Sequence, residues 1–96
     1  MKIYVDIDGT ICNNTNGDYE NAKPIWENIN KINQLYAEGN TIIYWTARGG
    51  NSGTDWSDLT RKQLKDWGCM YHELDTKSKP SWDLLIDDKT RRIEEL

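Results

Sequence analysis

Residues 2–10 decide the fold of this chain, and their sequence is Lys2-Ile3-Tyr4-Val5-Asp6-Ile7-Asp8-Gly9-Thr10. The first half is rich in β-branched and aromatic residues, which predicts a short buried strand. Asp6 and Asp8 follow where this strand ends, and Gly9 lets the chain turn away. In an open α/β sheet, ligands bind beyond the carboxyl ends of the strands. Paired carboxylates there suit a hard cation such as Mg²⁺, although an Asp-Gly turn with two solvated acids is the plain alternative.

Size and charge limit the number of domains and the kinds of partner expected for this protein. The 96 residues suit one domain, 1–96, with no room for a separate substrate domain. The formal net charge of -4 argues against nonspecific nucleic-acid binding, which needs a basic surface. No apolar run approaches the length of a membrane span, and no signal-peptide pattern begins the chain. Two cysteines without a CxxC motif predict reduced thiols in a cytoplasmic protein.

Helical and strand patterns alternate after residue 10. A helix is expected over 24–38, with Pro24 in its first turn, and an apolar strand over 41–45. A second helix begins near Asp55 and ends near Gly68, with Leu59, Leu64 and Trp67 as its expected buried face. The remaining expected elements are strands over 69–74 and 82–86, a helix over 89–96, and loops over 11–22, 47–54 and 75–81. This order implies a parallel sheet with right-handed crossovers.

Polar side chains stand in order at the ends of the expected strands. Asp6 and Asp8 follow the first, Thr46 follows the second, a lysine precedes the last, and Asp87-Asp88 follow it. This series resembles the four motifs of the haloacid dehalogenase superfamily, most of whose members are phosphatases. The resemblance covers nearly the whole chain and implies a three-layer Rossmann-like sheet with strand order 3-2-1-4.

Loop 11–22 has room for a flap or a tight hairpin but not for a cap domain. The chain therefore resembles the small capless phosphatases, of the kind found with capsule-biosynthesis and phage genes.

The resemblance implies a role for each acid. Asp6 would be the nucleophile that forms an aspartyl phosphate, and Asp8 would be the general acid and base. Asp6, Asp8, Asp87 and Asp88 would form the Mg²⁺ site, directly or through water.

The phosphoryl oxygens would be bound by the hydroxyl of Thr46, the amide of Ala47 and a lysine. Lys79 is preferred over Lys77 because Pro80 fixes the approach to the last strand. Arg48 would either bind a second anionic group of the substrate or form a surface ion pair with an acid.

The expected function is a Mg²⁺-dependent phosphatase acting on a small phosphorylated metabolite, such as a sugar or sugar-acid phosphate. One alternative is a nucleotide or polynucleotide-end phosphatase, and another is a non-catalytic phosphate-binding domain on the same fold. Tyr19, Trp56 and Trp82 either stack on the substrate or pack in the core, whereas His72 is expected to be structural. The many Trp and Tyr residues favour a homo-oligomer over a monomer with an open site.

Overall fold

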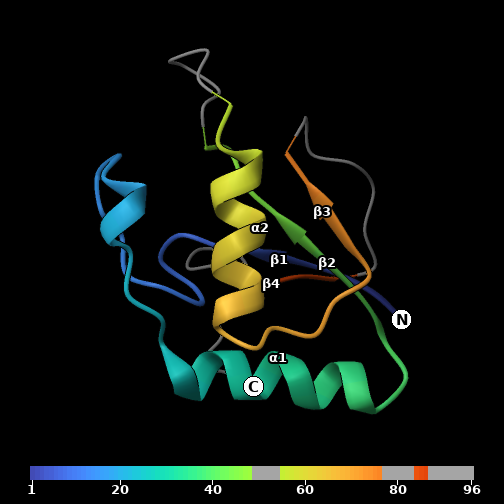
Figure 1. Cartoon of the computed structure of the whole chain (residues 1–96). Helices are drawn as coiled ribbons and strands as arrows, with labels where there is room; N and C mark the ends of the chain where they lie inside the picture. The colour runs from blue at the N-terminus through green and yellow to red at the C-terminus, as the bar shows by residue number, and fades with distance from the viewer. Residues whose placement is uncertain (49–54, 77–83, 87–96) are drawn as a thin grey trace.

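The computed structural model describes residues 1–48, 55–76 and 84–86. Its sheet has the strand order β3-β2-β1-β4 with parallel pairings between neighbours. The strands are β1 (Lys2–Asp6), β2 (Thr41–Trp45), β3 (Glu73–Asp75) and β4 (Leu84–Ile86), and the helices are α1 (Trp26–Ala37) and α2 (Ser57–Asp66) (Figure 1). A short 3-10 turn, η1 (Tyr19–Asn21), lies between β1 and α1. The chain is thus a small parallel α/β fold, and no cap is present among the described residues.

Both helices pack on the same face of the sheet. Alternate strand residues belong to one buried cluster with residues of α1 and α2; its members include Ile3, Val5, Ile42, Tyr44, Ile29, Ile32 and Leu64. The intervening residues Tyr4 and Ile43 form a second cluster, against which Trp45 packs. Right-handed crossovers from β1 to β2 and from β2 to β3 step in one direction, which places α1 and α2 together. The helix expected over 89–96, which would form a third layer, lies outside the described residues.

Helix α1 begins slightly later than the expected range of 24–38. The residues just before it are tied to the segment after β1: Pro24 forms an isolated bridge with Cys12, and the Ile25 N–H donates to the Ile11 carbonyl at 2.8 Å. These bonds hold the entry to the helix in extended conformation. They also place the first turn of α1 beside residues 10–12.

Helix α2 buries polar side chains where the sequence predicts apolar ones. Of the expected face, Leu64 is fully buried, whereas Leu59 and Trp67 are only partly covered. Thr60 (1% exposed) and Gln63 (8% exposed) take the remaining buried positions. They can be buried because each binds a polar partner from another element, as described below.

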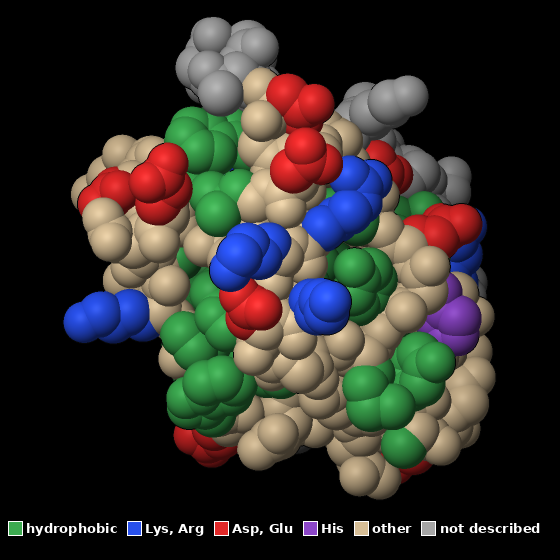
Figure 2. Space-filling view, in the orientation of Figure 1, with side chains coloured by type: hydrophobic (Ala, Val, Ile, Leu, Met, Phe, Trp, Pro, Cys, Tyr) green, Lys and Arg blue, Asp and Glu red, His purple; other side chains and the backbone are tan. Residues whose placement is uncertain are grey.

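The outward face of α2 is basic. Arg61, Lys62 and Lys65 are exposed there, and Figure 2 shows Lys and Arg side chains gathered over this helix. Lys62 also pairs with Asp66 at 2.8 Å, an exposed contact between successive helical turns. Within the described ranges, no helix has both the length and the apolar character needed to cross a membrane.

Strand β3 begins later than the expected strand 69–74 and includes Asp75, which the sequence assigns to a loop. The backbone N–H groups of Cys69 and Met70 donate to helices instead of to β2. The Met70 N–H, for example, donates to Oδ1 of Asn33 on α1 at 2.8 Å. A strand pattern in the sequence does not reveal that such competing partners lie nearby.

His72 fixes the start of β3. Its N–H donates to the Ile42 carbonyl at 2.8 Å, and its Nδ1 accepts the Ile42 N–H at 3.1 Å. An imidazole nitrogen therefore replaces the backbone acceptor that a regular ladder would supply. The ring also stacks on Tyr36 of α1, with the centroids 4.8 Å apart.

Candidate functional site

The ends of β1 and β2 bring three of the predicted site residues to one edge of the sheet. Asp6, the last residue of β1, is in register with Trp45, the last residue of β2. Thr46 therefore follows on the strand beside the Asp6-Ile7-Asp8 segment. Asp6 is partly buried, and its Oδ1 accepts the Ile7 N–H at 2.9 Å. The carboxyl edge of the sheet thus presents a carboxylate beside a hydroxyl.

Thr46 is held in place by its backbone and leaves its hydroxyl proton available. Its N–H donates to the Asp75 carbonyl at 3.0 Å, and its Oγ accepts the Arg48 N–H at 3.1 Å. The side chain is 1% exposed. Because the oxygen acts as acceptor toward Arg48, the hydroxyl hydrogen can still donate to another group.

The turn after β1 is closed by backbone hydrogen bonds. The N–H groups of Thr10 and Ile11 both donate to the Ile7 carbonyl, at 3.1 and 3.0 Å. Gly9 has φ of +84°, a conformation that residues with a Cβ rarely adopt. From α1, Asn28 Nδ2 donates to the Thr10 carbonyl at 2.8 Å. The turn that carries Asp8 is therefore fixed from both sides.

Arg48 binds the carboxylate of Asp8 in bidentate fashion. Its Nε donates to Asp8 Oδ2 at 2.9 Å, and its Nη2 donates to Asp8 Oδ1 at 2.8 Å. The Arg48 side chain is 0% exposed, whereas the Asp8 side chain is 20% exposed. The sequence offers a second substrate anion or a surface ion pair as partners for Arg48. In the structure the partner is an acid, and the pair lies inside the protein.

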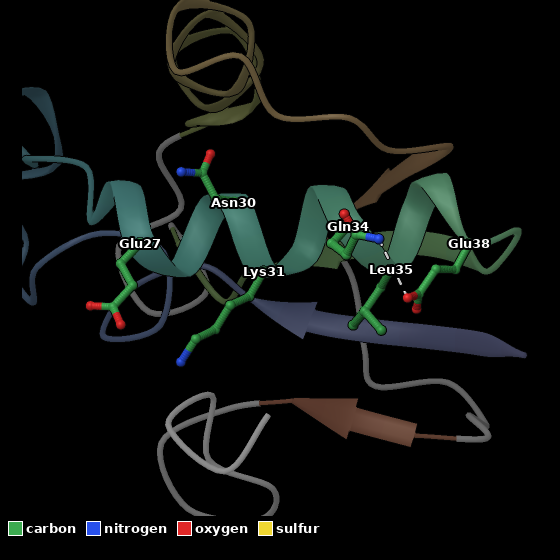
Figure 3. A pocket seen from close by; sticks show the side chains of 6 residues that line it. All are labelled: Glu27, Asn30, Lys31, Gln34, Leu35 and Glu38. Atoms are coloured by element: carbon green, nitrogen blue, oxygen red, sulfur yellow. Dashed lines mark hydrogen bonds between the residues drawn. The ribbon is translucent and has the colours of Figure 1, made fainter.

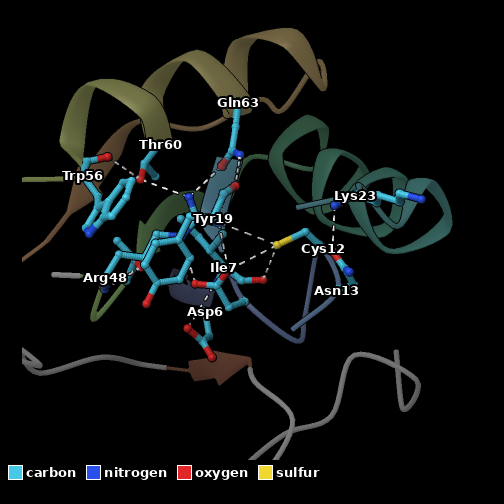
Figure 4. A network of polar contacts seen from close by, with 12 residues as sticks. Asp6, Ile7, Cys12, Asn13, Tyr19, Lys23, Arg48, Trp56, Thr60 and Gln63 are labelled. Atoms are coloured by element: carbon cyan, nitrogen blue, oxygen red, sulfur yellow. Dashed lines mark hydrogen bonds and ion pairs between the residues drawn. The ribbon is translucent and has the colours of Figure 1, made fainter. Parts of the chain in front are cut away.

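The rest of the guanidinium is also satisfied (Figure 4). Its Nη1 donates to Gln63 Oε1 at 2.6 Å and to Thr60 Oγ at 3.2 Å, both on α2. The ring of Tyr19 covers it, with the Arg48 Cζ 4.7 Å from the ring centroid. This cation-π contact adds to the hydrogen bonds. Arg48 therefore joins β1, α2 and loop 11–22 at one point.

Charge and burial shift the pKa values of two groups in this cluster. Burial lowers the pKa of Arg48, but the hydrogen bond and charge of Asp8 outweigh it and raise that pKa above its usual value. Burial, together with the charge of Asp8, raises the pKa of the Cys12 thiol to about 12. Arg48 is thus a permanent cation, and Cys12 is a neutral thiol that donates to Asp8 Oδ1 at 3.5 Å.

The structure describes some of the remaining predicted site residues and not others. Ala47 is exposed next to Thr46. The predicted phosphate lysine, whether Lys77 or Lys79, and the predicted metal ligands Asp87 and Asp88 lie outside the described residues. Trp82 does so as well.

Two of the aromatic residues that could stack on a substrate or pack in the core are described by the structure. Tyr19 and Trp56 pack edge-to-face on each other, with centroids 5.2 Å apart, so each has a protein partner.

Sequence reasoning missed Gln63, Thr60 and the contact of Tyr19 with Arg48. The signal available was weak: Thr60 and Gln63 lie one helical turn apart and beside Leu64, so they share its face of α2. Polar residues on the buried side of a helix indicate a buried partner. The sequence does not indicate which of the chain's cations that partner is.

In the described part of the chain, two open grooves are lined by residues other than Asp6 and Asp8. One, of about 390 Å³, runs along α1 and is lined by residues between Glu27 and Glu38 (Figure 3). The other, of about 450 Å³, lies at β3 and is lined by Arg61, Glu73, Leu74, Asp75 and Thr76. The second groove includes the carboxyl end of β3, because Asp75 is the last residue of that strand. This groove therefore lies at the same edge of the sheet as Asp6 and Thr46, on the side of β3.

Comparisons with known proteins support the fold alone. No family model matches the chain, and no curated protein matches it. A crystal structure of a target protein from Vibrio cholerae matches with a TM-score of 0.75 and 28% sequence identity. The match covers 98% of this chain and 85% of that chain. The described α/β arrangement is thus similar to a solved structure over almost the whole length, and the comparison assigns no activity.

Proposed function

We propose that this chain is a Mg²⁺-dependent phosphatase with a haloacid dehalogenase-type core, acting on a small phosphomonoester. The observation that carries the proposal is that Asp6 ends β1 and Thr46 directly follows the neighbouring parallel strand β2, with Asp8 fixed two residues after Asp6. The parallel sheet also has β4 beside β1, with Ile86 in register with Val5. In the sequence, Asp87 and Asp88 come directly after Ile86. A position of Asp87 and Asp88 near Asp6 is what the resemblance implies, and the neighbouring strands support it.

Asp6 would act as the nucleophile. One carboxylate oxygen attacks phosphorus, the bond from phosphorus to the leaving oxygen breaks, and an aspartyl phosphate forms. Water then attacks the same phosphorus, which releases inorganic phosphate and regenerates the carboxylate. Thr46 would donate its free hydroxyl hydrogen to a phosphoryl oxygen, a stabilisation that grows as charge develops there.

Asp8 would move the proton in both steps through Oδ2. Its Oδ1 accepts from Arg48 Nη2 and from the Cys12 thiol, whereas Oδ2 accepts only from Arg48 Nε among the described groups. Each carboxylate oxygen has two lone pairs, so Oδ2 keeps one for a proton. From that atom the proton passes to the leaving oxygen, and it later returns from the attacking water.

The donors at this edge suit a hard cation. Asp6 offers a carboxylate, and the backbone carbonyl of Asp8 is the second donor expected from the resemblance. The side-chain oxygens of Asp8 are bound by Arg48, so the carbonyl is the better candidate. The described residues contain no cluster of three acids, Cys or His that could hold a metal, and Asp87 and Asp88 would have to complete the site. Bound Mg²⁺ would supply positive charge against the phosphoryl oxygens.

The groove beside β3 supports a small substrate. Neighbouring strands are about 4.8 Å apart, so the end of β3 lies roughly 10 Å from the end of β1. A leaving group that extends from phosphorus across β2 would reach Arg61 and Asp75, which line this groove. Its mixed charges suit a polar, hydroxyl-bearing leaving group such as a sugar.

A screen of phosphate release tests the proposal. Purified protein is incubated with an aryl phosphate and a panel of sugar, sugar-acid and nucleotide monophosphates, with Mg²⁺ or with a chelator. We expect Mg²⁺-dependent release from small phosphomonoesters that is lost in Asp6→Asn. Asp58→Asn, at an exposed acid of α2, is the matched control and should retain activity. Release that is absent with every compound, or unchanged in Asp6→Asn, would contradict the proposal.

The bidentate pair favours a second candidate, a domain that binds phosphate without turnover. Two N–H donors from Arg48 already engage Asp8, which a freely moving general acid would not require. Equilibrium binding separates the two functions. Binding of a phosphomonoester that is never hydrolysed, and that weakens in Asp6→Asn, would select this alternative.

A further inference from the structure

Gln63 makes one hydrogen bond in each of two directions. Its Oε1 accepts from Arg48 Nη1 at 2.6 Å, and its Nε2 donates to the Tyr19 carbonyl at 2.6 Å. The side chain sits on α2 and is 8% exposed, so water cannot readily replace either partner. A buried amide with both ends engaged fixes the two groups relative to each other.

The loop between β1 and α1 is closed at its base. The Asn13 N–H donates to the Lys23 carbonyl at 3.0 Å, and the Lys23 N–H donates to Asn13 Oδ1 at 2.7 Å. We refer to residues 13–23 as the Tyr19 loop. Both bonds lie at the foot of the loop and leave its middle to be positioned by other contacts.

The middle of the Tyr19 loop contacts α2 and Arg48 through Tyr19. The carbonyl of Tyr19 accepts a hydrogen bond from Gln63, and its ring centroid lies 4.7 Å from the Cζ of Arg48. The rings of Tyr19 and Trp56 pack edge-to-face, with their centroids 5.2 Å apart. Figure 4 shows Gln63, Tyr19 and Arg48 gathered on the same side of Asp6. Movement of Tyr19 away from the body would uncover one face of the buried guanidinium.

The same guanidinium orients Asp8. Arg48 is 0% exposed in its side chain, and its two hydrogen bonds to Asp8 define the plane of the carboxylate. Gln63 accepts a hydrogen bond from the opposite edge of the guanidinium. A displacement of Gln63 or Tyr19 would therefore move the guanidinium and change the geometry of its hydrogen bonds to Asp8. The contact network thus runs from the Tyr19 loop through Gln63 and Arg48 to Asp8.

We propose that Gln63 is a positioning residue that couples closure of the Tyr19 loop to the orientation of Asp8 through Arg48. This inference rests on the proposed phosphatase function for its catalytic consequence, but the coupling itself is a property of the fold. The closed loop would keep bulk water from the site. It would also hold Oδ2 of Asp8 in the orientation that proton transfer to the leaving oxygen needs. When the loop opens, the Tyr19 ring no longer covers Arg48, and the orientation of the Asp8 carboxylate is no longer fixed.

Gln63→Met tests the coupling because it keeps the length of the side chain and removes both hydrogen bonds. Gln34→Met is the matched control: the same change on the exposed face of α1, where the amide of Gln34 contacts only Glu38 among the described side chains, at 3.4 Å. Asp8→Asn alters the far end of the network without touching the loop. Circular dichroism confirms that each variant is folded before it is compared.

Hydrogen exchange tests the coupling without any enzymatic activity. We expect faster exchange of amides in residues 13–23 in Gln63→Met and also in Asp8→Asn, since the loop would be held through Arg48. Gln34→Met should exchange like the wild type. Unchanged exchange of the loop in Asp8→Asn would overturn the coupling, whether or not the protein hydrolyses phosphate.

Steady-state kinetics with an aryl phosphate tests the consequence. Gln63→Met should lower kcat by about tenfold to a hundredfold with little change in KM, as expected when a reacting group is misplaced by up to about 1 Å. The loss should vanish when Asp8 is already Asn, because Gln63 acts through Asp8. An equal loss in both backgrounds would overturn the positioning role. A wild-type protein without phosphatase activity would refute the proposed function alone, and exchange would still decide the coupling.

Discussion

Replacing Arg48 by Met should destabilise this protein strongly. The substitution keeps much of the aliphatic stem but removes the cation that binds Asp8, Gln63 and Thr60. Breaking a buried ion pair by removing one partner costs about 3–5 kcal/mol, because the other charge is left without compensation. The Asp8 side chain is 20% exposed, so water can partly hydrate it. We therefore expect the lower end, about 3 kcal/mol.

This loss should be easy to measure. For a domain of this size each kcal/mol shifts Tm by about 4–8 °C, so Tm should fall by roughly 12 °C or more. Urea unfolding followed by tryptophan fluorescence gives the free energy, and an unchanged m-value would show that the unfolding reaction is the same. Arg61→Met, the same change at an exposed position of α2, should stay within about 0.5 kcal/mol of the wild type.

A double variant shows where the loss comes from. Asp8→Asn removes the charge that Arg48→Met leaves behind, so the double variant should be more stable than the sum of the two single losses implies. If Arg48→Met were as stable as Arg61→Met, the buried ion pair would not organise this site. If the two losses simply added, Arg48 and Asp8 would not form the coupled pair described here.

Three further predictions address the metal, the thiols and the assembly. Millimolar Mg²⁺ should raise Tm, because binding to the native state stabilises it, and the rise should shrink in Asp87→Asn; an identical rise would remove Asp87 from the metal site. Burial raises the pKa of Cys12 to about 12 and that of Cys69 to about 11, so at pH 8 both thiols are protonated in the native state. Labelling by a disulfide reagent should therefore be slow until the protein unfolds, and immediate labelling would contradict the burial. Light scattering at assay concentration should detect an oligomer in which a neighbouring subunit covers the site. A fully active monomer would rule out that arrangement.

The sequence predicts the framework of the site well because its signals are local. Strand Thr41–Trp45 is apolar after its first residue, and helix α1 shows Ile29 and Ile32 at helical spacing, both of which are buried. Asp6 and Thr46 follow two such runs, so their meeting at one sheet edge needs only the rule for parallel strands. Residues of this kind can be placed without knowing their partners.

The parts that the sequence did not predict depend on contacts between distant residues. Gln63 is polar and would be assigned to the surface of α2, yet it is buried because Arg48 needs acceptors on the side away from Asp8. His72 ends the bonding to helices and starts β3 by accepting the Ile42 N–H through its ring. Neither interaction has a pattern in the neighbouring sequence. Lys79, Asp87 and Asp88 lie outside the described residues, so their roles stay predictions.

Chemical trapping of the intermediate on Asp6 tests the central claim most directly. Asp8→Asn should slow hydrolysis of the aspartyl phosphate, so this variant is mixed with an aryl phosphate and Mg²⁺, quenched rapidly and treated with borohydride. Borohydride reduces an acyl phosphate to the alcohol, which converts the phosphorylated aspartate to homoserine. We predict homoserine at Asp6 in the peptide that contains residues 2–10, dependent on substrate and absent from Asp6→Asn. Phosphate release without homoserine at Asp6, or homoserine at another acid, would contradict the account.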